Sequence, residues 1–99
     1  MAGRVIQWSI TAFNQFEAAI GYIAEDSPQN AEKVRIDILN NIEKVLLHPE
    51  LYPVDKLKLQ NSGNFRAFEL HRYRIAYYFD AESVRILRVR HTSQEPKSY

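Results

Sequence analysis

The hydrophobic pattern near the start of the chain predicts a strand followed by a helix. Residues 4–8, Arg-Val-Ile-Gln-Trp, are rich in β-branched and aromatic side chains, as strands are. Apolar residues then recur at three- and four-residue steps, which is the spacing of one helical face. They are Phe13, Phe16, Ile20 and Ile23. We expect Ser9 or Thr11 to cap this helix, and Trp8 and the apolar stripe to enter the core.

A second helix is predicted between two prolines. Ser27 followed by Pro28 is typical of an N-cap with proline at the first helical position. An apolar stripe continues to about Leu47, and His48-Pro49 ends it because proline disfavours helix in the preceding residue. The stripe consists of Ala31, Val34, Ile38, Ile42 and Val45. The two helices are expected to form a hairpin that covers an apolar surface.

The second half of the chain predicts a loop and three strands. Residues 49–64 contain prolines and the turn-forming run Asn-Ser-Gly-Asn. Strand-like runs follow at 65–70, 73–79 and 84–91, and their short connections imply antiparallel hairpins. The order β-α-α-β-β-β predicts an α+β fold, with the helical hairpin packed on a mainly antiparallel four-stranded sheet. We expect one domain over residues 1–91 and a C-terminal tail over 92–99, either disordered or covering the open face of the sheet.

Alternation along the strands predicts two unlike sheet faces. Ile75, Tyr77 and Phe79 fall on one face and Arg74 and Tyr78 on the other. In the last strand the same rule places Leu87 with Val89, and Ile86 with Arg88 and Arg90. If the helices cover the aliphatic face, arginine and tyrosine side chains gather on the open one. This face is the strongest candidate binding site that the residues alone predict.

Charge supports an anionic partner for that face. Residues 1–49 carry four Lys or Arg against six Asp or Glu, whereas residues 50–99 carry nine against six. The halves therefore differ, at −2 and +3, although the net charge is only +1. Arginine suits bidentate contacts to phosphate or carboxylate. The candidate residues for binding such a partner are Arg66, Arg72, Arg74, Tyr78, Arg88 and Arg90.

Composition narrows the possible chemistry. The chain has no cysteine, so a thiol nucleophile, a disulfide and a cysteine-ligated zinc site are excluded. Its three histidines lack metal-ligand spacing and its three glycines are not clustered, so we expect neither a metal nor a cofactor. No run approaches the roughly 20 apolar residues of a membrane span. We expect a cytoplasmic protein without a membrane partner.

Several motifs resemble the RelE/ParE toxin superfamily over essentially the whole chain. They include the opening strand ending in Trp8, the Gly-Tyr-Ile run at 21–23 and the Ser27-Pro28 pair. More specific are Tyr-Arg-Ile-Ala-Tyr at 73–77 and Ile-Leu-Arg-Val-Arg-His at 86–91. The resemblance implies a type II toxin–antitoxin module whose toxin is held by a cognate antitoxin. It also implies that operator DNA is contacted only through the antitoxin.

The resemblance leaves the target open between two chemistries. RelE-like toxins cut mRNA on the ribosome, whereas ParE-like toxins poison DNA gyrase. Arg74 aligns with the strand arginine of the family and Tyr99 with the catalytic C-terminal tyrosine of RelE, and His91 is a candidate base near pH 7. However, Ser93 stands where RelE-type enzymes carry another arginine. The lysines that precede the Tyr-Arg strand in RelE are also missing, and each lost phosphate donor typically costs about 10²–10³ in rate.

Three functions are therefore compatible with the sequence, and we give them from the most to the least favoured. The first is a non-enzymatic, ParE-like toxin that arrests growth by inhibiting gyrase. The second is a ribosome-dependent mRNA endonuclease using Arg74, His91 and Tyr99. The third is an inactive toxin relative that serves only as an antitoxin-binding module.

Overall fold

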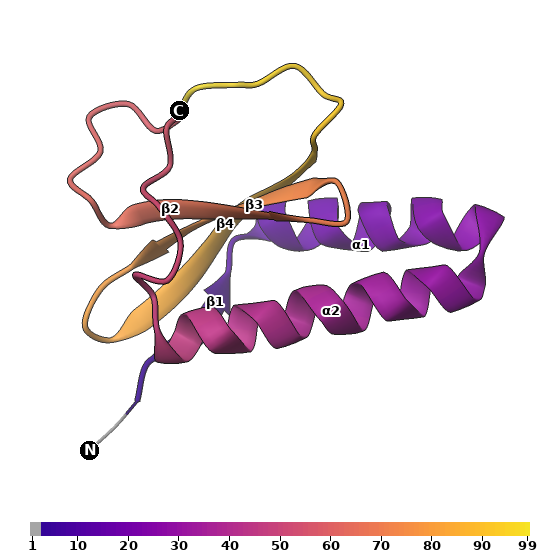
Figure 1. The fold of residues 1–99 in the computed structure, drawn as a ribbon, viewed down its shortest axis with the longest axis horizontal. Helices are drawn as coiled ribbons and strands as arrows, with labels where there is room; N and C mark the ends of the chain where they lie inside the picture. The colour runs from indigo at the N-terminus through magenta and orange to yellow at the C-terminus, as the bar shows by residue number, and fades with distance from the viewer. Residues whose placement is uncertain (1–2) are drawn as a thin grey trace.

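The computed structural model describes residues 3–99, so Met1 and Ala2 of the expected domain lie outside the described residues. The element order is β1 (Val5–Trp8), α1 (Ile10–Asp26), α2 (Pro28–Leu47), β2 (Phe65–Leu70), β3 (Tyr73–Phe79) and β4 (Ser83–His91). Figure 1 shows the two helices lying side by side as a hairpin against the sheet. The predicted α+β fold is confirmed.

Both helices begin where their capping serines predict. The Ser9 hydroxyl accepts a hydrogen bond of 3.0 Å from the Ala12 N–H, and Ser27 accepts one of 3.1 Å from the Asn30 N–H. Each cap satisfies one of the donors that a helix start leaves unpaired. Pro28 occupies the first turn of α2, where its fixed φ fits and its missing N–H costs nothing.

The sheet is mixed, with strand order β1-β4-β3-β2. The β2–β3 and β3–β4 pairs are antiparallel, whereas β1 runs parallel to β4, pairing Val5 with Ser83 and Trp8 with Ile86. The β2–β3 connection is the two-residue turn His71-Arg72, in which both residues have positive φ angles of 53° and 68°. Two consecutive positive φ angles are what a type I′ hairpin turn requires.

The core lies between the helical hairpin and one face of the sheet. All five residues of the predicted α2 stripe are buried, and Ile75, Tyr77 and Phe79 meet them from β3. On α1 the prediction for Phe13 was wrong, because its side chain is 52% exposed. The buried positions of α1 are Ala12, Phe16 and Ile20, a strict four-residue step that leaves Phe13 to one side. Trp8 packs against the core, with its ring centroid 5.2 Å from that of Phe16.

A β-bulge in β4 overturns the predicted face of Ile86. Ala76 pairs with Arg88 but Tyr77 pairs with Ile86, so Leu87 is an extra residue on the β4 side. An extra residue shifts the alternation of inward and outward side chains by one position. Ile86 is therefore fully buried in the core together with Val89, instead of sharing the face of Arg88 and Arg90.

The opposite face of the sheet is covered by two segments without regular structure. They are the loop 48–64 and the tail, residues 92–99, which meet near residue 99 on the side away from the helices (Figure 1). The tail is fastened to the loop by two backbone hydrogen bonds, from Tyr99 N–H to the Leu57 carbonyl at 3.0 Å and from Leu59 N–H to the Tyr99 carbonyl at 2.7 Å. Of the two alternatives for the tail, the structure shows the covering one.

Candidate partner-binding face

Three of the predicted arginines come together on the face beneath the tail. Arg74 on β3 is the cross-strand partner of Arg90 on β4, and Arg88 lies opposite Ala76, one step further along the same face. Side chains of directly paired residues point to the same side of a sheet. All three arginines also line one cavity of about 110 Å³ between the sheet and the tail.

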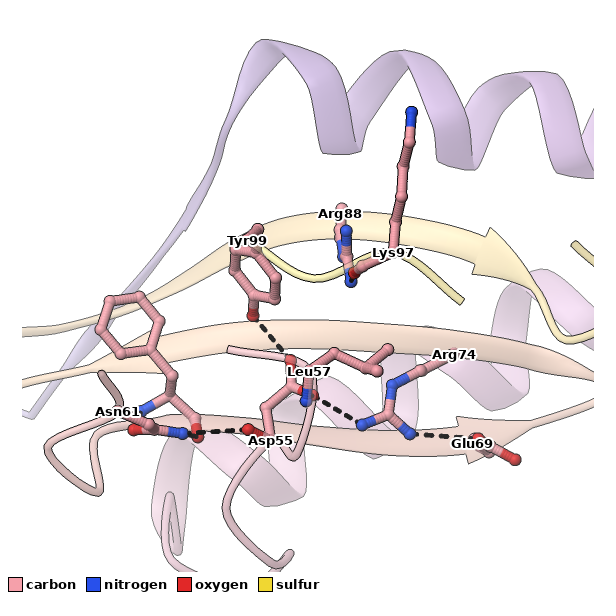
Figure 2. A network of polar contacts seen from close by, with 9 residues as sticks. Asp55, Leu57, Asn61, Glu69, Arg74, Arg88, Lys97 and Tyr99 are labelled. Atoms are coloured by element: carbon pink, nitrogen blue, oxygen red, sulfur yellow. Dashed lines mark hydrogen bonds and ion pairs between the residues drawn. The ribbon is translucent and has the colours of Figure 1, made fainter. Parts of the chain in front are cut away.

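A buried carboxylate, Asp55, organises this face. Asp55 is 1% exposed and accepts hydrogen bonds of 2.7 Å from the Arg74 guanidinium and 2.7 Å from the Tyr99 hydroxyl. A third bond of 3.0 Å comes from the Leu57 N–H. Figure 2 shows Asp55 at the centre of the network, between Tyr99 and Arg74. One acidic side chain therefore joins the loop, strand β3 and the tail.

The loop around Asp55 is held beside β2. Val54 forms an isolated antiparallel bridge with Arg66, and the Asp55 N–H donates to the Phe65 carbonyl at 2.8 Å. The Asn61 amide donates to the Asp55 and Phe65 carbonyls at 3.2 and 2.8 Å. These bonds place the Asp55 side chain toward the open face of the sheet, where Arg74 meets it.

The electrostatics of the network favour charged Asp55 and neutral Tyr99. Burial alone would raise the pKa of Asp55, but hydrogen bonds from Tyr99, Arg74 and the Leu57 N–H outweigh it and lower the pKa. Burial, followed by the hydrogen bond to Asp55, raises the pKa of the Tyr99 hydroxyl well above its usual value. Burial lowers the pKa of Arg74, but Asp55 and Glu69 more than compensate, so its pKa is raised. Asp55 and Arg74 therefore form an ion pair, and the Tyr99 hydroxyl donates a hydrogen bond to the same carboxylate.

The tail also contacts the other two arginines. The Arg88 guanidinium donates to the Lys97 carbonyl and stacks on the Tyr99 ring at 4.1 Å from its centroid. Arg90 donates to the Glu95 carbonyl at 3.1 Å. These arginines therefore bind neutral backbone oxygens, whereas Arg74 binds two carboxylates, those of Asp55 and Glu69.

The other predicted binding residues lie elsewhere or are already engaged. Arg66 pairs with Tyr77 and so shares the helix-covered face, where it donates to the Gly63 and Tyr52 carbonyls at 2.9 Å each. Arg72 is exposed in the β2–β3 turn. Tyr78 is on the open face, with its ring 4.9 Å from that of Phe65. The structure therefore does not gather all six residues into one surface.

The three candidate nuclease residues meet in pairs, because Asp55 joins Arg74 to Tyr99 and the cavity joins Arg74 to His91. Arg74 and His91 both line the cavity, but Tyr99 does not, and its hydroxyl is bound to Asp55. The His91 ring packs edge-on against Tyr73 at 5.0 Å, and its Nδ1 accepts a hydrogen bond of 3.0 Å from the Ser93 N–H. A nuclease needs its acid, base and phosphate donor around one reacting atom.

Asp55 was not found by sequence reasoning. It stands in a loop rich in proline and turn-forming residues, where an aspartate is usually solvent-exposed. Neither alternation nor helical spacing applies in such a loop, so no pattern marks the residue as buried. Its partners lie 19 and 44 positions away along the chain.

Two further observations concern residues 3–99. Neither helix in this part of the chain has the length and hydropathy needed to cross a bilayer. Within the same residues there is no group of three or more His, Cys, Asp or Glu side chains that could hold a metal ion.

The fold and the basic face describe a small α+β protein with a candidate partner-binding surface. Comparison with known families shows which family the chain belongs to. The family model described as ParE toxin of type II toxin-antitoxin system, parDE, matches residues 6–96. The chain therefore belongs to the ParE toxin family of type II toxin–antitoxin systems. No curated protein matches the sequence.

Solved structures agree on the fold. The chain is similar to one in a structure described as the chromosomal ParDE TA system from P. aeruginosa, with a TM-score of 0.68. The match covers 91% of this chain and 97% of the other, at 15% sequence identity. At that identity the likeness concerns the architecture, which both chains share over almost their whole lengths.

Proposed function

We propose that this protein is a growth-arresting toxin that inhibits DNA gyrase through a protein–protein contact. The proposal depends on one observation: two side chains that a nuclease would need are already bound by carboxylates of the same chain. Arg74 is bound by Asp55 and Glu69, and the Tyr99 hydroxyl is bound by Asp55. A tyrosine with a raised pKa is a poor general base at neutral pH. Membership of the ParE family supports the same choice of mechanism.

We further propose that a cognate antitoxin neutralises the protein in the cytoplasm. An acidic, amphipathic antitoxin segment complements the arginines of the open face or packs near the helical hairpin. The P. aeruginosa structure is described as a chromosomal ParDE TA system, and its matched chain has the architecture of this protein. Complex formation with the protein of a short neighbouring reading frame, weakened by salt, is the expected result. Operator DNA is contacted by that antitoxin and not by the toxin.

Two parallel assays test the gyrase proposal. Purified protein is added to gyrase with relaxed plasmid and ATP, and also to translating ribosomes followed by primer extension. We expect supercoiling to stop and mRNA to stay uncut. Codon cleavage without an effect on gyrase would instead establish the endonuclease.

A matched pair of variants tests the part played by the arginine face. Arg90→Gln removes a charge from the cavity wall, and we expect it to raise the half-inhibitory concentration about tenfold, or about 1.4 kcal/mol. Arg85→Gln is the control, because Arg85 is exposed on the same strand and bonds Gln7 instead. Arg85 is on the same face but outside the cavity lining, so equal potency of the two variants would remove the cavity wall from the gyrase contact.

Expression in cells addresses the possibility of an inactive relative. Induction without an antitoxin should arrest growth, and co-expression with the antitoxin should restore it. Unaffected growth, with the folded protein present at normal levels, would leave only the antitoxin-binding module.

A further inference from the structure

The cavity beneath the tail contains an unused hydrogen-bond donor. The Arg74 Nε is buried and has no hydrogen-bond partner among residues 3–99. Figure 2 shows the two terminal nitrogens of Arg74 meeting Asp55 and Glu69, and neither carboxylate accepts from Nε. A buried donor without an acceptor costs about 1–3 kcal/mol. Arg74 lines the cavity, so a water molecule or an anion held there can supply the acceptor.

The neighbouring arginines also have unused capacity. Among residues 3–99, neither Arg88 nor Arg90 has a carboxylate partner, and their bonds go to the backbone carbonyls of Lys97 and Glu95. A guanidinium carries five N–H donors, and hydrogen bonds to an anion are roughly twice as strong as those to a neutral acceptor. Both groups can therefore keep the tail in place and still donate to a bound anion.

The walls of the cavity have a strong excess of positive charge. Lys56 lines it from the loop, and Arg74, Arg88 and Arg90 line it from the sheet, whereas Glu69 is the one acidic residue in the lining. His91 also lines it, and because its Nδ1 accepts from Ser93, the neutral ring carries its proton on Nε2. At about 110 Å³ the space exceeds the share of a single water molecule several-fold.

We propose that this cavity is a phosphate-binding site. Cationic donors reach it from the sheet on one side and from the loop on the other, an arrangement that suits a tetrahedral dianion better than a flat carboxylate. The bound oxygens accept from the Arg74 Nε and from the remaining N–H groups of Arg88 and Arg90. The ligand is inorganic phosphate or the phosphate of a small monoester. The proposal is independent of gyrase inhibition.

The tail closes this site from outside, and Tyr99 fastens the tail. Pro96 and Lys97 line the cavity, whereas Tyr99 does not; its contacts are with Asp55, the Leu57 and Leu59 backbone and the Arg88 guanidinium. Loss of the Tyr99 hydroxyl should therefore weaken phosphate binding without removing any group that touches the ligand. Tyr99 is thus a positioning residue for the site.

Calorimetric titration of the full chain with inorganic phosphate, at constant ionic strength in chloride, tests the proposal. We expect saturable binding of one phosphate per chain and at least tenfold weaker binding of acetate. Arg90→Gln should weaken phosphate binding about tenfold, as expected for one lost charge-assisted hydrogen bond. Arg85→Gln should leave it unchanged. Absence of saturable binding, or equal weakening by the two variants, overturns the proposal.

Two further arms keep the test decisive. Lys56→Gln removes a charge from an exposed loop position, so it should fold normally and still weaken binding several-fold. It replaces Arg90→Gln if that variant melts early. Titration with a small phosphomonoester identifies the source: tighter binding than inorganic phosphate indicates an organic phosphate, and equal or weaker binding indicates the free ion. A failure of both ligands to bind contradicts the site.

Discussion

The two faces of the sheet are stabilised in different ways. The face beneath the helices is covered by long apolar stripes, and residues such as Ile38 and Ile86 contribute by their buried area. The opposite face is covered by the loop and the tail, which meet it through the hydrogen bonds and ion pair of Asp55. Apolar burial is distributed over many side chains and depends little on pH. A polar network depends on single atoms and on their protonation, so the two faces should respond differently to the same perturbations.

The largest effect is expected from Asp55→Ala. This substitution leaves the Arg74 guanidinium without its most buried partner and removes the acceptor of the Tyr99 hydroxyl. Breaking one side of a buried ion pair typically costs about 3–5 kcal/mol. Urea unfolding followed by circular dichroism measures the free energy of unfolding. A loss below about 1 kcal/mol would show that the covering segments contribute little to stability.

A smaller effect, specific to one face, is expected from acid. The pKa of Asp55 is lowered in the folded protein, so its contribution is present above the unfolded value of about 3.9 and is lost as pH falls through the folded pKa. The loss is smaller than in Asp55→Ala, because a protonated carboxyl still forms hydrogen bonds. The cost of Asp55→Asn should therefore shrink between about pH 5 and pH 3.

Ile38→Ala is the control for the acid experiment on the helix-covered face. Its cost of about 2–5 kcal/mol comes from lost apolar contacts and a cavity, and should stay constant over the same pH range. Asp37 and Asp80 also have lowered pKa values, so wild type alone cannot report on Asp55. Parallel pH profiles for Asp55→Asn and wild type would contradict the assignment.

Tyr99→Phe should cost about 1.5 kcal/mol. It removes one hydrogen bond to a buried carboxylate but keeps the ring that stacks under Arg88. Because the bond fastens the tail, backbone amides of residues 57–59 should exchange faster with solvent, while those of α2 should not. Hydrogen exchange followed by mass spectrometry distinguishes this local loosening from a general loss of stability, which would speed exchange in both regions.

The smallest effect is expected at the surface. Lys33→Gln removes an exposed ion pair of 3.2 Å with Asp37 on the outside of α2. Such exposed pairs at i, i+4 contribute little to stability, because solvent screens the two charges and holding both side chains in place costs entropy. Differential scanning calorimetry should show a shift in melting temperature close to the error of the measurement. A shift comparable to that of Tyr99→Phe would contradict the contrast between buried and exposed charge.

The sequence predicted most of the fold because its signals are local. Capping by Ser27 with Pro28, the helical spacing on α2 and the alternation on β3 each depend on neighbouring residues, and all three were confirmed. The bulge at Leu87 arises from the pairing between β3 and β4, which the sequence of one strand does not determine. The predicted face of Ile86 was therefore wrong. The prediction that Phe13 is buried was wrong because Phe13 and Ala12 are both apolar. Only tertiary packing determines which of the two enters the core.

The candidate site was predictable to a smaller extent. Alternation brought Arg74, Arg88 and Arg90 onto one face, and the structure places them around one cavity. Asp55 and the covering role of the tail depend on contacts between distant segments without regular structure, for which no periodic signal exists. Arg66 lies on the helix-covered face because it pairs with Tyr77 of β3. The sequence of β2 alone does not determine this register.

The parallel pairing of β1 with β4 has a consequence for synthesis of the protein. Val5 pairs with Ser83, so β1 cannot join the sheet until nearly the whole chain has been synthesised. Contacts between such distant segments form late and slowly. A product truncated before β4 would have a helical hairpin with its apolar stripe uncovered, a substrate for cellular proteases. Prematurely terminated copies should therefore be degraded before they can act.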